Sequence, residues 1–82
     1  MVEKKLVELT RRERQVLGEL TRDGANNQQI ADRLGLSIDT VKTYMVRMHR
    51  KFEVDNRTAL VVECLKGRVI VRVIGQEPSA NA

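Results

Sequence analysis

Two helix-start signals and one stop signal lie close together within residues 26–37. Asn26 is followed three positions later by a glutamine, which is the capping-box pattern of a helix N-terminus, and apolar residues then recur at helical spacing over 27–34. Gly35 is the residue type that ends helices in the left-handed conformation, and Ser37 supplies the next N-cap. Because so short a turn separates the two helices, the sequence predicts a helix-turn-helix.

The flanking segments carry the same kinds of signal. Thr10, with a glutamate three residues later, predicts a helix over 11–23, and Asn56 predicts another over 57–66. With 82 residues, the chain is long enough for one small domain and has little spare core for a catalytic cavity. We therefore predict an all-α bundle of four helices that occupies residues 9–67.

The helix predicted over 38–52 has two different faces. Its apolar positions recur at helical spacing and form the core face: Val41, Tyr44, Met45, Met48 and Phe52. An outward ridge places three cations among shorter side chains: Asp39, Lys42, Thr43, Val46, Arg47 and Arg50. A major groove about 12 Å wide admits one helix, so this ridge favours groove binding over a merely solvated face. The turn alone also fits an ordinary helical hairpin with no role in DNA binding.

Composition restricts the partner and the compartment. A net charge of +4 favours a polyanion, and one Tyr and one Phe are too few for the stacking platforms of single-strand binders, so we expect double-stranded DNA. The lone Cys64 allows no internal disulfide and no apolar stretch is long enough to span a bilayer, so we expect a cytoplasmic protein without membrane contact. His49, the sole histidine, lacks catalytic or metal-binding partners in the sequence; we expect no enzyme, metal or cofactor.

Four groups of residues, in order and at fixed spacing, resemble the LuxR/GerE type of DNA-binding domain. They are Leu9-Thr10-x-Arg12-Glu13-Arg14-x-Val16-Leu17, Gly24-x-x-Asn27-x-x-Ile30-Ala31-x-x-Leu34, Leu36-Ser37-x-x-Thr40-Val41-Lys42 and Lys51-Phe52-x-Val54-x-x-Arg57. The resemblance covers about residues 9–68, far more than a lone helix-turn-helix match. It implies a bacterial transcription regulator whose third helix reads the major groove and whose fourth helix dimerises.

The resemblance also implies roles for individual residues. The expected base-contacting residues are Lys42, Thr43, Val46 and Arg47. The expected phosphate-contacting residues are Asn27, Thr40, Arg50, Lys51 and Arg57. The chemistry supports these roles, since Lys42 and Arg47 can donate to guanine and Val46 can touch a thymine methyl group. Asn27 stands at a helix N-terminus, where exposed backbone amides favour a phosphate.

This chain departs from the family pattern in three places. Tyr44 stands where the family usually has histidine, and Val46 is apolar at a position that is often polar. The first change is expected to be structural, and the second to shift base preference. The third departure is a valine-rich extension after Gly67, which exceeds the usual end of the family's domain.

The fourth predicted helix is apolar on more than one side. Packing one side on the bundle would leave Ala59 and Val62 without a partner, so we expect them to form a homodimer interface, unless the following segment covers them. That segment, 68–75, is rich in β-branched residues and predicts a strand, which pairs with a second subunit or lies irregularly across the domain. Residues 1–8 are expected to be an N-terminal arm or linker end, and 76–82 a disordered tail.

The expected function is therefore sequence-specific binding of duplex DNA by a homodimer on two half-sites. One alternative is a promoter reader similar to sigma-factor region 4, which also resembles the Leu-Thr-x-Arg-Glu-Arg start. Another is a protein-interaction module that contacts RNA polymerase through Val62 and the extension. Replacing Lys42 and Arg47 by alanine separates DNA binding from these partner roles.

Overall fold

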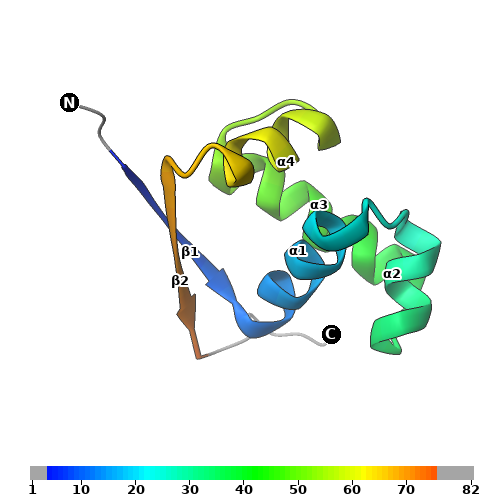
Figure 1. The fold of residues 1–82 in the computed structure, drawn as a ribbon. Coiled ribbons are helices and arrows are strands. Elements are labelled where there is room, and N and C mark those ends of the chain that lie inside the picture. The colour runs from blue at the N-terminus through cyan, green and yellow to red at the C-terminus, as the bar shows by residue number, and fades with distance from the viewer. Residues whose placement is uncertain (1–3, 76–82) are drawn as a thin grey trace.

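The computed structural model describes residues 4–75, which form four helices and two strands (Figure 1). In chain order they are β1 (Lys5–Thr10), α1 (Arg11–Asp23), α2 (Asn27–Leu34), α3 (Ile38–Phe52), α4 (Arg57–Leu65) and β2 (Val69–Ile74). The predicted four-helix bundle is confirmed, and α4 ends one residue earlier than expected. The tail predicted at 76–82 lies outside the described residues.

The helix starts have the predicted capping geometry. The Glu13 amide donates to Thr10 Oγ1 at 3.2 Å, and the Thr10 amide donates to Glu13 Oε1 at 2.9 Å, which completes the capping box of α1. Asn26 and Gln29 make the same reciprocal pair at the start of α2. Both boxes satisfy backbone amides that have no partner inside the helix.

The turn between α2 and α3 is as tight as predicted. Gly35 adopts a left-handed conformation with φ of 68°, where a side chain would be strained, and the Leu36 amide donates to the Ala31 carbonyl at 2.9 Å. Ser37 then caps α3, since its hydroxyl accepts from the Thr40 amide at 3.1 Å. Half-buried Leu36 packs against the core, so the turn holds α3 at a fixed position beside α2.

One hydrophobic core joins the helices to the first strand. Its fully buried members come from β1 and from all four helices: Leu9, Val16, Ile30, Val41, Met48 and Leu60. Leu9 lies just before the cap of α1 and is part of this core, as a hydrophobic staple requires. The core fixes which face of each helix remains in contact with solvent.

The extended segment predicted after α4 is strand β2, and its partner is strand β1 of the same chain. The two strands are parallel, with Lys5 opposite Val69 and Thr10 opposite Ile74, and they lie along one side of the helices (Figure 1). Both predicted alternatives, pairing with a second subunit and an irregular course across the domain, are therefore wrong. Residues 5–8, expected to belong to an arm or linker end, form most of β1. A parallel pair needs a long crossover connection, which the four helices supply here.

Candidate nucleic-acid interface

The inner face of α3 holds this helix against the rest of the domain. Val41 and Met48 are fully buried, Met45 and Phe52 nearly so, and half-buried Tyr44 packs against the same core, as predicted. The side chains exposed on the other face are Asp39, Lys42, Thr43, Val46 and Arg50. The apolar packing therefore turns a continuous polar and basic ridge toward solvent.

Three of the four predicted base-contacting residues are exposed on this ridge. They are Lys42, Thr43 and Val46, and 50 % of Val46 is accessible to solvent. The Thr43 hydroxyl donates to the Asp39 carbonyl at 3.1 Å, so its oxygen can still accept a hydrogen bond. The ridge thus offers a cation, a hydroxyl and an apolar surface on adjacent helical turns.

The fourth predicted base-contacting residue, Arg47, lies against Tyr44. Its guanidinium carbon is 5.7 Å from the centroid of the Tyr44 ring, which is within the range of a cation–π contact. Arg47 is half-buried, and its guanidinium lies over the face of the ring. Tyr44, which we expected to be structural, therefore also restrains a candidate base-reading cation.

Two of the predicted phosphate contacts lie at opposite ends of α3. Thr40 is at the N-terminal turn, where its hydroxyl accepts from Ser37 Oγ at 2.8 Å. Arg50 is exposed in the last turn. Among residues 4–75, neither Arg50, Lys42 nor Arg47 forms an ion pair with a carboxylate, so these cations of α3 are available to an anion.

The predicted phosphate contacts Asn27 and Arg57 bind to each other. Arg57 Nη1 donates to Asn27 Oδ1 at 2.7 Å, and Nη2 donates to the carbonyl of buried Ala25. Partial burial lowers the pKa of Arg57 from its ordinary value, because desolvation disfavours the charged form. The structure thus joins the first turn of α4 to the first turn of α2 and leaves a cation beside the amides of the α2 N-terminus.

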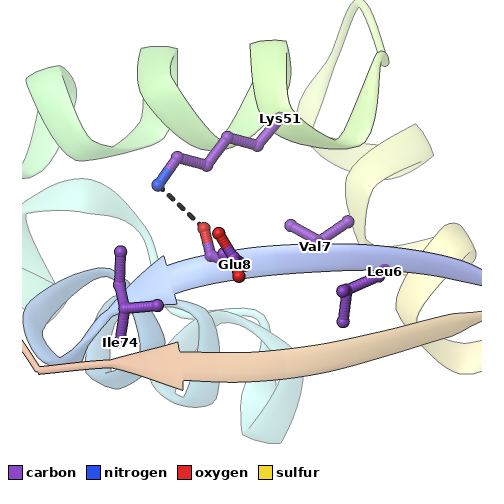
Figure 2. Close-up of a pocket in the computed structure, with 5 residues that line it drawn as sticks. All are labelled: Leu6, Val7, Glu8, Lys51 and Ile74. Carbon is purple, nitrogen blue, oxygen red and sulfur yellow. Dashed lines mark hydrogen bonds between the residues drawn. The ribbon is translucent and has the colours of Figure 1, made fainter.

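The last predicted phosphate contact, Lys51, points into the protein. Its Nζ lies 2.7 Å from Glu13 Oε1 and 2.9 Å from the Glu8 carbonyl oxygen. Figure 2 shows the Lys51 side chain extending from α3 toward β1 and the bond to Glu8. Glu13 was predicted as a capping residue only, and no local pattern in the sequence indicates its second role.

The cations between α1 and α2 are already neutralised by carboxylates. Arg33 pairs with Asp23 at 2.9 Å and with Glu19 at 3.0 Å, and Arg22 also pairs with Glu19. The hydrogen bond to Asp23 is the main cause that raises the pKa of Arg33. Within the described residues, the positive charges between α1 and α2 are therefore compensated by carboxylates, unlike those of Lys42, Arg47 and Arg50 on α3.

A second exposed surface lies on α4. Val62 is 39 % exposed and Leu65 is 72 % exposed, whereas Ala59 is half-buried. Val62 was predicted to lie in a dimer interface, and Leu65, three residues further along the same helix, was not included. Helical spacing from Val62 would have indicated it. Strand β2 therefore does not cover the apolar stripe of α4.

The described part of the chain shows neither a group of metal ligands nor a membrane-spanning helix. In residues 4–75, no three His, Cys, Asp or Glu side chains are grouped as metal ligands would be. None of the described helices is long and apolar enough to cross a membrane. Two buried side-chain atoms, His49 Nε2 and Glu13 Oε2, have no hydrogen-bond partner among these residues.

Comparison with known proteins places this arrangement in context. Residues 7–64 match the model of a family described as bacterial regulatory proteins, luxR family. The monoamine regulon transcriptional regulator of Klebsiella aerogenes is 47 % identical over 53 residues, which are 65 % of this chain and 23 % of that protein. The transcriptional regulatory protein DegU of Brevibacillus brevis is 45 % identical over 65 residues, which are 78 % of this chain and 27 % of that protein. The chain thus spans about a quarter of the length of these relatives.

Proposed function

Because this chain belongs to the luxR family of bacterial regulatory proteins, we propose that it binds duplex DNA sequence-specifically as a homodimer, with α3 in the major groove. The family assignment confirms the resemblance found in the sequence. It also confirms that the chain is not an enzyme, since the family and the relatives are transcription regulators. Regulation of transcription from a promoter with two half-sites is the role we infer for the protein that carries this domain.

The observation that carries the proposal is the outer ridge of α3. Lys42, Arg47 and Arg50 have no carboxylate partner among the described residues, although nearby Arg33 is fully paired. The 15 residues of α3 span roughly 22 Å at about 1.5 Å per residue, and a major groove about 12 Å wide accepts one such helix. Arg50 at the C-terminal end of the ridge can therefore reach the DNA backbone while Lys42, Val46 and Arg47 face the bases.

We assign base contacts to the middle of this ridge. Lys42 and Arg47 carry donors that match the O6 and N7 acceptors of guanine, and Arg47 is preoriented by the Tyr44 ring. Val46 offers exposed apolar surface for a thymine methyl group. Thr43 adds a hydroxyl between these long side chains.

We assign phosphate contacts to residues around the ridge. Thr40 and Arg50 lie at the two ends of α3, and Asn27 with Arg57 lies at the α2 N-terminus, whose backbone amides attract anions. These contacts position the helix and carry no sequence information themselves. If Arg50 and Arg57 each neutralise one phosphate, log affinity falls with log salt at a slope of roughly −1.8 per subunit.

We assign dimerisation to the exposed stripe on α4. Ala59, Val62 and Leu65 present an apolar surface that the rest of the described chain leaves in contact with solvent. A two-fold axis at this stripe would place the same surface of each subunit against the other and hold two copies of α3 for two half-sites. Contact with RNA polymerase is a further proposal for the whole protein. The family match favours a dimeric DNA-binding regulator over a promoter reader of the sigma-factor type.

The test is selection of bound duplexes from a random pool, followed by titration of the enriched sequence with variant proteins. The variant Lys42→Ala/Arg47→Ala should weaken binding to the selected duplex by about tenfold or more, because each bidentate base contact supplies about 1–3 kcal/mol. Two half-sites in the enriched sequences would support the dimer.

The control variant is Lys66→Ala/Arg68→Ala, which removes two exposed cations between α4 and β2. It lowers the net charge by the same amount and should leave the preference for the selected duplex intact. Equal losses in both double variants would mean that charge alone drives binding, and would contradict sequence-specific reading by α3.

A further inference from the structure

The C-terminal end of α3 is fixed by an ion pair with an interior carboxylate. Lys51 Nζ lies 2.7 Å from Glu13 Oε1, and the Glu13 side chain is only 1 % exposed. The same oxygen accepts from the Thr10 amide at 2.9 Å, whereas the second carboxylate oxygen is buried and has no partner among residues 4–75. A buried carboxylate with one unpaired oxygen depends strongly on its cation, so Lys51 is held firmly in this position.

The strand β1 takes part in the same connection. Lys51 Nζ also donates to the Glu8 carbonyl oxygen at 2.9 Å, as Figure 2 shows. In the opposite direction, Lys5 Nζ from β1 donates to the Phe52 carbonyl at 3.4 Å and pairs with Glu53 at 2.7 Å. One lysine from α3 and one from β1 thus connect the C-terminal end of α3 to β1.

The direction of Lys51 differs from that of the DNA-facing ridge. Nine residues separate Lys51 from Lys42, so at about 100° per residue the two side chains leave α3 on roughly opposite sides. Arg50 lies only about 80° from Lys42 by the same spacing and is exposed. Lys51 is therefore directed toward α1 and β1, and Arg50 remains on the side of the ridge.

We propose that Lys51 is a positioning residue, which acts through Glu13 to set the orientation of α3 in the groove, and is not a phosphate contact. Apolar packing of buried Met48 and Phe52 holds the helix to the core through contacts that have no preferred direction. The Glu13–Lys51 pair adds directional bonds at one end of the helix. This proposal rests on the proposed function and gives Lys51 a different role from the one that the family resemblance implied.

The experiment compares Lys51→Met, Arg50→Met and Glu13→Gln in the full chain, each with the selected duplex and a scrambled duplex, across a range of salt concentrations. Lys51→Met should bind the selected duplex about tenfold less tightly and the scrambled duplex nearly as well as the wild type, with an unchanged salt slope. Arg50→Met, the matched control, should weaken both duplexes and reduce the slope by about 0.9, as loss of one phosphate contact does.

Glu13→Gln distinguishes the two roles even if Lys51→Met unfolds. The amide keeps the size of the side chain and an acceptor for the Thr10 amide but removes the charge that holds Lys51. If Lys51 positions α3, Glu13→Gln should lose preference for the selected duplex by a similar factor, and the double variant with Lys51→Met should lose little more.

The opposite pattern would overturn the proposal. If Lys51 contacts phosphate, Lys51→Met reduces the salt slope as Arg50→Met does, and Glu13→Gln releases the lysine and strengthens binding to both duplexes. Failure of the proposed function looks different, because the wild-type protein would then enrich no sequence from the random pool.

Discussion

Arg57 at the start of α4 donates to Asn27 at the start of α2 at 2.7 Å, and the two residues are 30 positions apart in the chain. The same guanidinium donates to the carbonyl of Ala25, which is buried and follows the end of α1. One side chain therefore connects the helix proposed for dimerisation to the loop that leads into the helix-turn-helix.

Replacing Arg57 by methionine should destabilise the domain. The change leaves the Ala25 carbonyl without its partner, and loss of hydrogen bonds to a charged group costs about 1–3 kcal/mol. The free energy of unfolding in urea measures the loss. Arg11→Met, at an exposed position on α1, is the control and should lie within about 0.5 kcal/mol of the wild type. A loss confined to DNA binding, with unchanged unfolding, would show that Arg57 acts on DNA alone.

Glu53 ends α3 with a left-handed backbone, at φ of 59° and ψ of 47°. Glu53→Gly should be more stable than Glu53→Ala by about 1 kcal/mol, because glycine adopts this conformation without steric cost and alanine does not. Both variants lose the ion pair with Lys5, so their difference isolates the backbone. Thermal unfolding compares them, and equal melting temperatures for the two variants would contradict the strain.

Helix boundaries were predictable because their signals are local. Thr10 and Glu13 lie three residues apart. Gly35, which ends α2, and Ser37, which begins α3, are directly adjacent to the helices that they delimit. The exposed ridge followed from helical spacing alone, since Lys42 and Val46 lie on the side opposite the buried residues.

Long-range pairings were not predictable in the same way. β1 and β2 lie far apart in the sequence and pair only in the fold. β1 is six residues long and ends at Thr10, the N-cap of α1, so its sequence pattern is short and overlaps with the helix-start pattern. The partners of Lys51 and Arg57 are 38 and 30 positions away and depend on how the helices pack. The family pattern identified these cations but could not indicate which of them the fold itself uses.

Asp23 should titrate below its ordinary range. Its hydrogen bond to Arg33 is the largest cause that lowers the pKa of the carboxyl group, and Arg22 contributes less. A lowered native pKa means that the ion pair stabilises the fold above the unfolded-state pKa and loses this effect as the pH falls through the native pKa. Arg33→Gln should raise the carboxyl midpoint observed by NMR, and Arg22→Gln should raise it less. An equal response to the two substitutions would contradict the assignment to Arg33.

Leu65 and Ile70 provide a direct comparison of two exposed apolar surfaces, since 72 % of the first and 50 % of the second are accessible. Leu65→Lys should weaken self-association by about tenfold or more, because it places a charge in the proposed α4 interface. Ile70→Lys adds the same charge on the outer face of the sheet and should leave self-association unchanged. Sedimentation equilibrium measures both. If Ile70→Lys alone yields monomers, the dimer forms through the sheet instead of α4.

Val46 should read thymine through its methyl group. If it does, replacing the contacted thymine of the selected duplex by deoxyuridine removes one buried methyl group and weakens binding by about 0.8 kcal/mol, or about fourfold. Val46→Ala should weaken binding to the thymine duplex by a similar factor and respond little to deoxyuridine, because the apolar contact is already lost. Lys42 and Arg47 contact other groups in the proposed interface, so their alanine variants should retain the response to deoxyuridine. A Val46→Ala protein that still discriminates thymine from uracil would leave the exposed valine without a role in base recognition.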